Sequence, residues 1–383
     1  LLPVPLNFST LQDVFAYLNA LPEKIIVVID EYPYLKAMND SATVDSIFQN
    51  IIDNRLVNIE LILSGSHIGM MKDTLQEKNA LYGRFAVTIK LNELNYLETA
   101  KFYPDKTPYD KAAHYAVFGG SPFVNQALNP EAAIRENIIS TILNPMSAVY
   151  LYANQLLLSD YSVKINAERI FSVIGNGKKR YTEIEDKLDV KKTGNLSKQI
   201  KSLIDLEIVA RNSPINKIGD HKKSTFEIND NLLRFYFTFI YKNASALQVL
   251  GAEAFYDEYI APALTDFVSR RFEGICRDYF SLQVRSGKMK GVRNIGSYYY
   301  DDPIHHKNGE FDVALEFADG YEIYEAKYYA QPMTLDEIHR EVRQVEGIKE
   351  LTVKQIGFIA INGFVEREEP YFYLDGNDIF ASE

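Results

Sequence analysis

The stretch Lys24–Leu35, KIIVVIDEYPYL, decides the fold of the first part of the chain. Five apolar residues, Ile25–Ile29, run directly into two adjacent carboxylates, Asp30 and Glu31. An unbroken β-branched run predicts a strand buried on both faces, as in a parallel sheet that helices cover. The carboxylates then lie at the C-terminal end of the strand, where open α/β sheets bind ligands. Asp30 could help to hold Mg²⁺ on a nucleotide and Glu31 could orient a water, although a strand with an acidic turn is the plainer interpretation.

The segments around this strand predict a parallel α/β sheet, because helices and strands alternate along the chain. The next strand ends in Ser64-Gly65-Ser66, and a polar side chain there would reach the γ-phosphate or the attacking water. Ser64 is the first candidate and Ser66 the second, with a turn that only ends the strand as the alternative. The expected elements are a helix over Thr10–Leu21, a helix over Ser41–Asn54, a strand over Asn58–Leu63 and a strand over Ala86–Leu91.

A single arginine, Arg84 in LYGRF, stands just before the last of these strands. A guanidinium suits the stabilisation of a transferring phosphoryl group, because it is permanently charged and offers a fork of donors to phosphate oxygens. A surface arginine or one held in a salt bridge is the alternative. Acting between subunits, such an arginine would require a homo-oligomer, but it could also act within one chain.

Four pieces occur in the order VVIDEYPYL, LILSGS, LYGRF and GGSPFV. This order resembles the archaeal-type ATPase family, in the AAA and STAND branch of P-loop NTPases, over roughly residues 20–130. The resemblance implies ATP and Mg²⁺ as cofactors. It also implies the following roles: Asp30 and Glu31 as Walker B, Ser64 or Ser66 as sensor-like, Arg84 in the Gly-Arg motif, and Gly120-Ser121-Pro122 as the GxP element near the adenine.

One departure from that family is large. No G-x-x-x-x-G-K-[ST] occurs in these residues, and without that backbone nest and its lysine little would hold the phosphates. The chain as given is therefore expected to bind ATP poorly or not at all. It opens LLPVPLNF, without Met, so we expect a truncated start with the P-loop upstream.

Composition limits the classes of protein that fit. A chain of 383 residues suggests two or three domains, and 46% hydrophobic residues are ample for their cores. No apolar run approaches the roughly 20 residues that span a bilayer, so no membrane association is predicted. The single cysteine, Cys276, excludes an internal disulfide framework and a Cys-based zinc site, and it fits a cytoplasmic setting. With a net charge of −11, any contact with DNA must come from a local basic patch.

Such a patch follows the first domain. The α/β part is predicted to end near residue 110, a helical lid to cover 111–164, and a winged helix to cover 165–245, because three helices precede a hairpin there. Residues 165–223 carry 13 Lys or Arg against 8 Asp or Glu. The residues expected to contact phosphate are Lys191, Lys192, Lys198 and Lys201, with Asn195 and Gln199 nearer base edges. A solvated helical face, or a winged helix used for protein contacts, is the alternative.

The last region, 250–383, predicts a second α/β domain with a mixed sheet. Asp312 stands on one strand of a hairpin that turns at Asp319-Gly320, and Glu325-Ala326-Lys327 stands on the next. Glu325 and Lys327 are two apart and share a face, and counting back from the turn places Asp312 within reach of Glu325. Two carboxylates and a backbone carbonyl can hold Mg²⁺, and Lys327 can polarise or deprotonate a water that attacks a phosphodiester.

Glu273, on the preceding helix, could add a third carboxylate to this metal site. The pattern resembles the PD-(D/E)xK nuclease superfamily, and in the ATPase family named above a domain of that type follows a winged helix. Glu325 and its neighbours match a short pattern that also arises by chance, and such a site can be retained for structure alone. His305 and His306 are interpreted as a polar loop, and Cys276 as a helix core residue.

The expected fold is therefore α/β: a partial P-loop NTPase sheet with a helical lid, a winged helix-turn-helix and a nuclease-like domain. The expected function is a cytoplasmic prokaryotic ATPase that couples nucleotide state to a winged-helix DNA contact and a nuclease-like domain. The alternative is a regulatory or scaffold protein in which both sites are silent and the same domains bind DNA or a protein partner.

Overall fold

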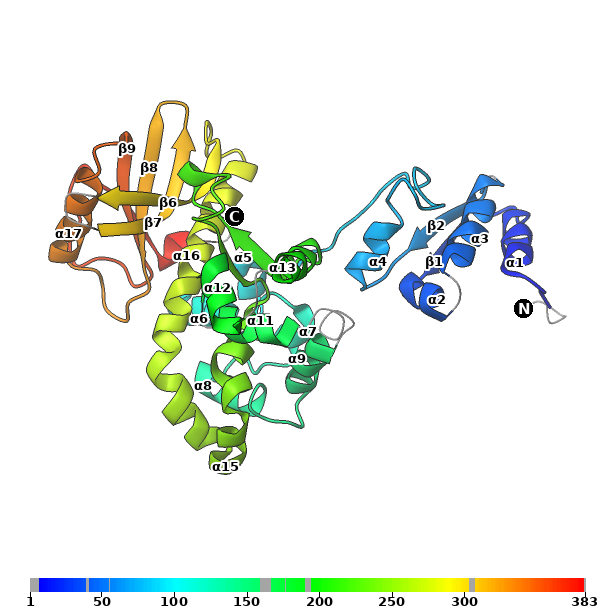
Figure 1. Ribbon diagram of the computed structural model, residues 1–383, viewed down its shortest axis with the longest axis horizontal. Coiled ribbons are helices and arrows are strands. Elements are labelled where there is room, and N and C mark those ends of the chain that lie inside the picture. The colour runs from blue at the N-terminus through cyan, green and yellow to red at the C-terminus, as the bar shows by residue number, and fades with distance from the viewer. Residues whose placement is uncertain are drawn as a thin grey trace. The chain divides into compact units, whose positions relative to one another are not determined.

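The computed structural model describes residues 7–38, 41–54, 56–158, 167–175, 177–189, 194–302 and 307–381. The chain is of the mixed α/β class and divides into two compact units, Leu1–Leu91 and Asn92–Glu383 (Figure 1). We call them the N-terminal unit and the C-terminal unit. The sequence placed the end of the α/β part near residue 110, whereas the division falls at residue 91. The predicted DNA contacts Lys191 and Lys192, and the pair His305-His306, lie outside the described residues.

The N-terminal unit is built on two parallel strands in the register Ile25↔Ile59 to Ile29↔Leu63. Helix α1 begins at a capping box, in which Thr10 accepts from the backbone of Asp13 and the carboxylate of Asp13 accepts in return. The elements are α1 (Leu11–Asn19), β1 (Ile25–Ile29), α2 (Tyr32–Met38), α3 (Ser41–Asp53), β2 (Ile59–Leu63) and α4 (Ile68–Asp73).

The prediction that the first strand is buried on both faces is wrong. Ile26 and Val28 of β1 are 64% and 56% exposed, and Ile62 of β2 is 48% exposed. The reason is that the core of this unit gathers on one face of the sheet, around Phe15 of α1 and Phe48 of α3, whose rings lie 6.3 Å apart. An apolar run in the sequence therefore does not distinguish a covered strand from one with a bare face.

The predicted strand over Ala86–Leu91 is also absent. This segment has no regular structure, and Val87, Ile89 and Leu91 are 72%, 78% and 90% exposed. Among the described residues of this unit, β1 pairs with β2, and the segment belongs to no sheet. Without a ladder, β propensity alone does not form a strand.

The C-terminal unit begins with five helices, of which the last three and most of the second fall in the predicted lid, 111–164. Their largest core is shared with helices and strands from the far end of the chain. The Tyr96 hydroxyl donates to the Ile379 carbonyl at 3.0 Å, and the Tyr328 hydroxyl donates to the Tyr109 carbonyl at 3.0 Å. These helices are α5 (Tyr96–Ala100), α6 (Pro108–Phe118), α7 (Pro122–Gln126), α8 (Ile134–Ser140) and α9 (Ala148–Leu158).

The next part, residues 167–228, is called the three-helix module here. It holds three helices and a small antiparallel sheet of strand order β3-β5-β4, in which β3 lies between the first two helices and β4 and β5 follow the third. Its separate core gathers around Ile170, Ile200 and Phe226. Its elements are α11 (Ala167–Ile174), β3 (Lys179–Arg180), α12 (Tyr181–Leu188), α13 (Asn195–Asp205), β4 (Val209–Asn212), the 3₁₀ turn η1 (Ile215–Lys217) and β5 (Thr225–Ile228).

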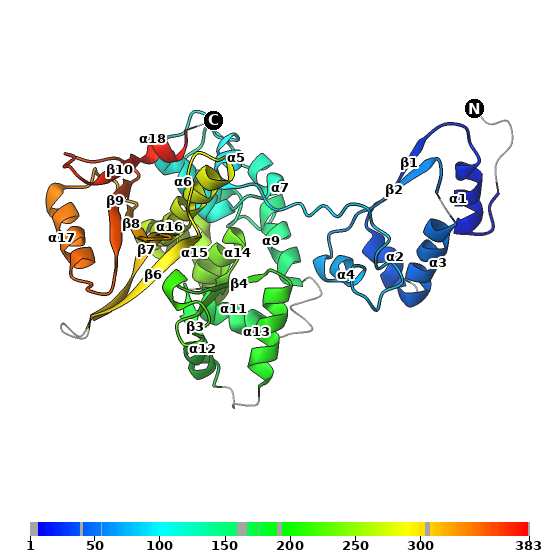
Figure 2. The ribbon, with the colours of Figure 1, turned by 90° about the horizontal axis from the view of Figure 1, so that it is seen from above.

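A five-stranded mixed sheet of order β10-β9-β8-β7-β6 ends the chain, and we call it the C-terminal sheet. Helix α16 covers one face and α17 the other (Figures 1 and 2). Its strands are β6 (Asn294–Asp302), β7 (Lys307–Phe317), β8 (Gly320–Lys327), β9 (Val353–Ala360) and β10 (Phe372–Asp375). The helices are α14 (Asn231–Phe235), η2 (Tyr236–Ile240), η3 (Tyr241–Asn243), α15 (Ala244–Phe255), η4 (Tyr256–Ile260), α16 (Ala261–Arg285), α17 (Leu335–Glu346) and α18 (Gly376–Ile379).

The three-helix module is fastened to the C-terminal sheet through the loop between β4 and β5. The side chain of Asn216 donates to the Tyr299 carbonyl at 2.7 Å and accepts from the Tyr299 N–H at 3.0 Å, as a neighbouring strand would. Ile215 packs so closely on Gly296 that a Cβ there would lie 2.6 Å from it. The loop between β4 and β5 therefore packs on the C-terminal sheet. Among the described residues, no helix is both long and apolar enough to cross a membrane.

Candidate functional site

The C-terminal sheet brings together the acidic and basic residues that the sequence singled out. The β7–β8 hairpin pairs Phe317 with Gly320 and Val313 with Tyr324. One further step in the same register sets Asp312 opposite Glu325, as the count from the turn predicted. The charges of these two carboxylates act on each other strongly, and the N–H of Ala326 donates to Asp312.

Lys327 belongs to the same cluster of charged side chains as Asp312 and Glu325. Its Nζ lies 2.6 Å from Oε1 of Glu325 and 3.6 Å from Oε1 of Glu341. Glu341 belongs to α17, is only 9% exposed, and was missed from the sequence. A signal was present, because Glu341 interrupts the apolar stripe of Ile338, Val342 and Val345 on the buried face of that helix.

Helix α16 also contributes charged side chains to the cluster. Nη1 of Arg277 donates to the Asp312 carbonyl at 2.7 Å, and the charge of Glu273 acts on the Asp312 carboxyl. Oε2 of Glu273 in turn lies 3.6 Å from Nζ of Lys178, which belongs to the three-helix module. Lys178 and Glu273 are far apart along the chain, and no pattern in the sequence connects them.

Electrostatics in the cluster have clear physical causes. Burial, together with the charges of Glu325 and Glu273, holds the pKa of Asp312 well above its ordinary value. Burial also raises the pKa of Glu325, against the opposing charge of Lys327. For Lys327, burial alone would lower the pKa, but the charges of Glu325 and Glu341 outweigh it and raise the pKa above its ordinary value. Lys327 is thus a protonated ammonium at neutral pH. Among the described residues, no group of three or more His, Cys, Asp or Glu side chains is placed so that it could hold a metal ion.

In the N-terminal unit, the acidic end of β1 meets the polar end of β2. The Ser64 hydroxyl donates to Oδ1 of Asp30 at 2.6 Å, and the N–H of Glu31 donates to the same oxygen at 3.0 Å. Ser66 donates to Oε2 of Glu31 from its N–H at 3.3 Å and its hydroxyl at 3.2 Å. The structure therefore brings together both carboxylates and both serines that the sequence selected.

The backbone around these groups is held in an uncommon conformation. Glu31 has a φ of 51°, in the left-handed region that non-glycine residues rarely adopt. The turn after β2 packs on the first turn of α2, since a Cβ on Gly65 would lie 2.3 Å from Cδ of Pro33. Such strain is found where the surrounding structure fixes it, often at functional sites.

The other residues expected around a nucleotide have different surroundings. Arg84 forms a bidentate ion pair with Asp53 at the end of α3, with distances of 2.8 and 2.9 Å, and donates to the Ala80 carbonyl at 2.8 Å. This is the salt-bridged arrangement that the sequence left open for Arg84. Gly120 and Pro122 belong to the C-terminal unit, where Pro122 begins α7 and Gly120 accepts from the N–H of Leu94 at 3.0 Å.

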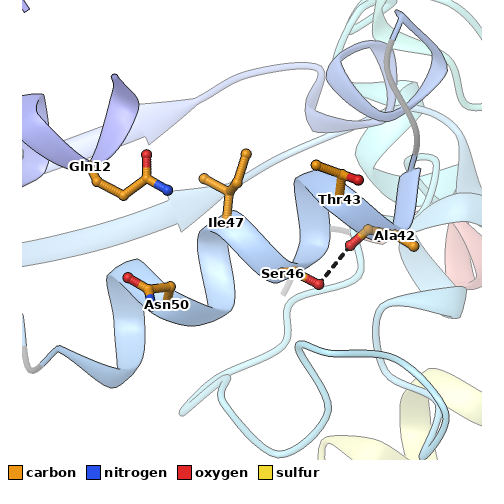
Figure 3. Close-up of a pocket in the computed structure, with 6 residues that line it drawn as sticks. All are labelled: Gln12, Ala42, Thr43, Ser46, Ile47 and Asn50. Atoms are coloured by element: carbon orange, nitrogen blue, oxygen red, sulfur yellow. Dashed lines mark hydrogen bonds between the residues drawn. The ribbon is translucent and has the colours of Figure 1, made fainter. Parts of the chain in front are cut away.

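A shallow pocket of about 480 Å³ lies in the N-terminal unit (Figure 3). Its lining comes from α1 and α3 and carries no charged side chain. The lining residues are Gln12, Ala42, Thr43, Ser46, Ile47 and Asn50. None of the residues predicted to carry chemistry lines it, so we give this pocket no role.

Helix α13 presents the expected DNA contacts that the structure describes. Lys198 and Lys201 are exposed, whereas Leu196, Ile200 and Leu203 of the same helix are buried in the module's core. Asn195 is exposed beside them and Gln199 is half-buried. The basic face of this helix is thus directed to solvent.

Comparisons with known proteins find relatives for part of this α/β chain, but none of them has a known function that could be compared. Residues 236–342 match the family model DUF234, described as archaea bacterial proteins of unknown function. The matched range holds most of the C-terminal cluster: Glu273, Asp312, Glu325, Lys327 and Glu341. The uncharacterized protein MJECL04 of Methanocaldococcus jannaschii is 28% identical over 272 residues, which cover 70% of this chain. The match spans only 60% of that relative's length.

Two solved structures align with most of the chain at low similarity. Protein VC1899 of Vibrio cholerae is 8% identical with a TM-score of 0.26, over 96% of this chain and 93% of that chain. Can2 of Sulfobacillus thermosulfidooxidans, solved with cyclic tetra-adenylate, is 9% identical with a TM-score of 0.22, over 92% of this chain and 87% of that chain. TM-scores this low do not show a common fold and support no functional argument.

Proposed function

We propose that this protein acts on DNA through a Mg²⁺-dependent, nuclease-like site in its C-terminal unit. The observation that carries the proposal is the convergence of Asp312, Glu325 and Lys327 on one face of the C-terminal sheet. This is the residue set of the PD-(D/E)xK pattern, and its order along the chain follows the predicted winged helix. The three-helix module would be that winged helix, since its helix and strand order agrees.

The donor set suits Mg²⁺, a hard cation that prefers carboxylate oxygens. Asp312 and Glu325 would hold the ion, and their mutual repulsion in a buried setting is what a divalent cation relieves. When bound, the ion would neutralise phosphate charge and lower the pKa of a coordinated water. Lys327 hydrogen-bonds Glu325 and has further N–H donors for an oxygen of the substrate. Because it is protonated, it would polarise the reacting groups and not serve as the base.

The test is cleavage of a panel of DNA substrates with Mg²⁺ or Mn²⁺. Asp312→Ala and Lys327→Ala should each lower the rate by about a hundredfold or more. Glu316→Gln, which removes a carboxylate from the same strand, is the matched control and should cleave as the wild type does. A wild type that cuts none of the substrates would refute the active-nuclease proposal.

The N-terminal unit would supply the Walker B half of an ATP site, and the bond between Ser64 and Asp30 carries this second proposal. Asp30 would hold Mg²⁺ on the nucleotide, and Glu31 would orient the attacking water. In a form of the protein that includes a P-loop, Glu31→Gln should abolish ATP turnover, and Glu23→Gln, at an exposed position before β1, should not. Turnover that survives Glu31→Gln would refute this assignment.

DNA binding and assembly complete the proposal. Lys198 and Lys201 would contact phosphates, so Lys198→Glu should weaken binding, and binding should fall with salt. Arg84 would reach a phosphate, in its own chain or across a homo-oligomer, only by leaving Asp53.

A silent regulatory or scaffold protein is the second candidate. Its supporting observation is that Lys327 and Glu325 already satisfy each other at 2.6 Å. The cleavage assay separates the two, because a scaffold would bind DNA or a protein partner without cutting.

A further inference from the structure

The contact between Lys178 and Glu273 joins the three-helix module to the C-terminal cluster. Glu273 lies on α16 beside Asp312, and Lys178 is its ion-pair partner, with side chains 23% and 26% exposed respectively. Both side chains are half-buried, and at 3.6 Å the two charged atoms are farther apart than in a hydrogen bond, so the pair is weak. The lysine can therefore change partners at small cost, whereas Glu273 remains at the edge of the cluster.

The surroundings of Lys178 are basic and geometrically fixed. It opens the run Lys178-Lys179-Arg180, whose last two residues form β3, the edge strand of the module's sheet. Alternation along an extended segment sets Lys178 and Arg180 on one side, and Arg180 is exposed. Gly177, with a φ of 109°, passes so close to α16 that a Cβ there would lie 3.0 Å from Nη1 of Arg270. Positive side chains from two elements thus lie near Lys178.

A buried ion pair holds the three-helix module against α16. Glu227 of β5 accepts from Nη1 of Arg271 at 3.0 Å, and both side chains are buried. Arg271 directly follows Arg270 and stands two residues before Glu273. The position of Lys178 beside Glu273 is therefore a consequence of how the module docks.

We propose that Lys178 is a DNA-phosphate-binding residue that rests on Glu273 when no DNA is bound, and that exchanges Glu273 for a backbone phosphate when DNA arrives. The exchange frees the Glu273 carboxylate beside the metal-binding cluster, so DNA binding and metal binding favour each other. By linkage, each ligand strengthens the other by the same factor. This inference rests on the proposed nuclease-like site, but its phosphate contact can be tested without metal.

The first experiment measures DNA affinity as a function of salt in the absence of divalent metal. The probe is a short duplex with phosphorothioate linkages, which resist cleavage. Lys178→Met should weaken binding and reduce the slope of log K against log salt by about 1, because one phosphate contact is lost. Lys178→Arg should keep the slope. Lys187→Met, which removes one positive charge from α12 of the same module, controls for net charge. A slope unchanged by Lys178→Met would overturn the phosphate contact.

The second experiment titrates Mn²⁺ calorimetrically with and without the same duplex. In the wild type, DNA should tighten Mn²⁺ binding by about fivefold. In Lys178→Met, Mn²⁺ should bind more tightly without DNA, and DNA should add nothing further. If DNA strengthens Mn²⁺ binding equally in Lys178→Met and the wild type, the exchange is wrong.

Failure of the underlying site has a different signature. Asp312→Ala should lose Mn²⁺ binding whether or not DNA is present. If the wild type and Asp312→Ala bind Mn²⁺ alike, the metal site is wrong and the coupling falls with it. Unchanged melting temperatures for the Lys178 variants will show that their effects are local.

Discussion

The buried ion pair between Glu227 and Arg271 offers the sharpest test of how the C-terminal unit is held together. Glu227 is 9% exposed and Arg271 is 8% exposed, and they join β5 of the three-helix module to α16 at 3.0 Å. Nη2 of Arg234 lies 3.4 Å from the same carboxylate, and Asn212 donates to its other oxygen at 2.5 Å. One carboxylate therefore serves three partners from three elements.

The predicted cost of Glu227→Ala follows from what it leaves behind. Arg271 would keep its charge in a buried setting, where burial already lowers its pKa. Removing one partner of a buried pair typically costs 3–5 kcal/mol, and the orphaned amide of Asn212 adds about 1 kcal/mol. Arg234 is affected less, because its Nε also donates to the Ile228 carbonyl at 2.9 Å. We expect a loss of about 5 kcal/mol in the free energy of unfolding.

Urea denaturation followed by circular dichroism measures this loss. Asp257→Ala is the matched control, since it breaks the solvent-exposed pair between Arg135 and Asp257 and should cost much less. Replacing both Glu227 and Arg271 by leucine should recover part of the stability, because the charge of Arg271 is then no longer buried without a partner, whereas Arg234 still loses its carboxylate. If Glu227→Ala costs no more than Asp257→Ala, the pair does not fasten the module.

Three other perturbations have defined outcomes. Gly65→Ala should destabilise the N-terminal unit by about 1–3 kcal/mol in thermal melts, because its Cβ would lie 2.3 Å from Pro33. Asn216→Ala should cost about 1–3 kcal/mol in urea denaturation, because it leaves the N–H and carbonyl of Tyr299 unpaired. His114 is fully buried, and burial lowers its pKa to about 4, so the neutral form stabilises the fold above pH 6.5. That stability, about 3 kcal/mol, should be lost as the pH falls from 6.5 to 4.

Each of these has a control and an outcome that would contradict it. Gly274→Ala, where a Cβ meets nothing closer than 3.9 Å, should be neutral or stabilising; equal losses at Gly65 and Gly274 would remove the steric argument. Wild-type stability in Asn216→Ala would mean that its two hydrogen bonds to β6 contribute nothing. Replacing His114 by glutamine should flatten the pH dependence between 6.5 and 4, and an unchanged profile would assign that dependence to other groups.

Part of this structure could be predicted from interactions between residues that are close in the sequence. The β1 strand with Asp30 and Glu31 at its end follows from a run of β-branched residues, and the structure joins this end to Ser64. The pairing of Asp312 with Glu325 follows from the hairpin turn, because the register of a hairpin is fixed by its turn. The order of three helices and a hairpin in the three-helix module could also be predicted, because it follows from the periodicity of hydrophobic residues.

The contacts between these elements and distant parts of the chain could not be predicted from the sequence. The sequence by itself determined most of the helices and strands and which side chains share a face, since these depend mainly on neighbours a few residues away. The exception is the strand predicted over Ala86–Leu91, because a strand also needs a pairing partner. Only the tertiary structure decided that β1 has a bare face, that Glu341 reaches Lys327, and that Lys178 meets Glu273. Those contacts join segments far apart in the chain, and they form because whole elements dock by burying their apolar faces. That docking depends on the summed packing of many residues, which no single motif encodes.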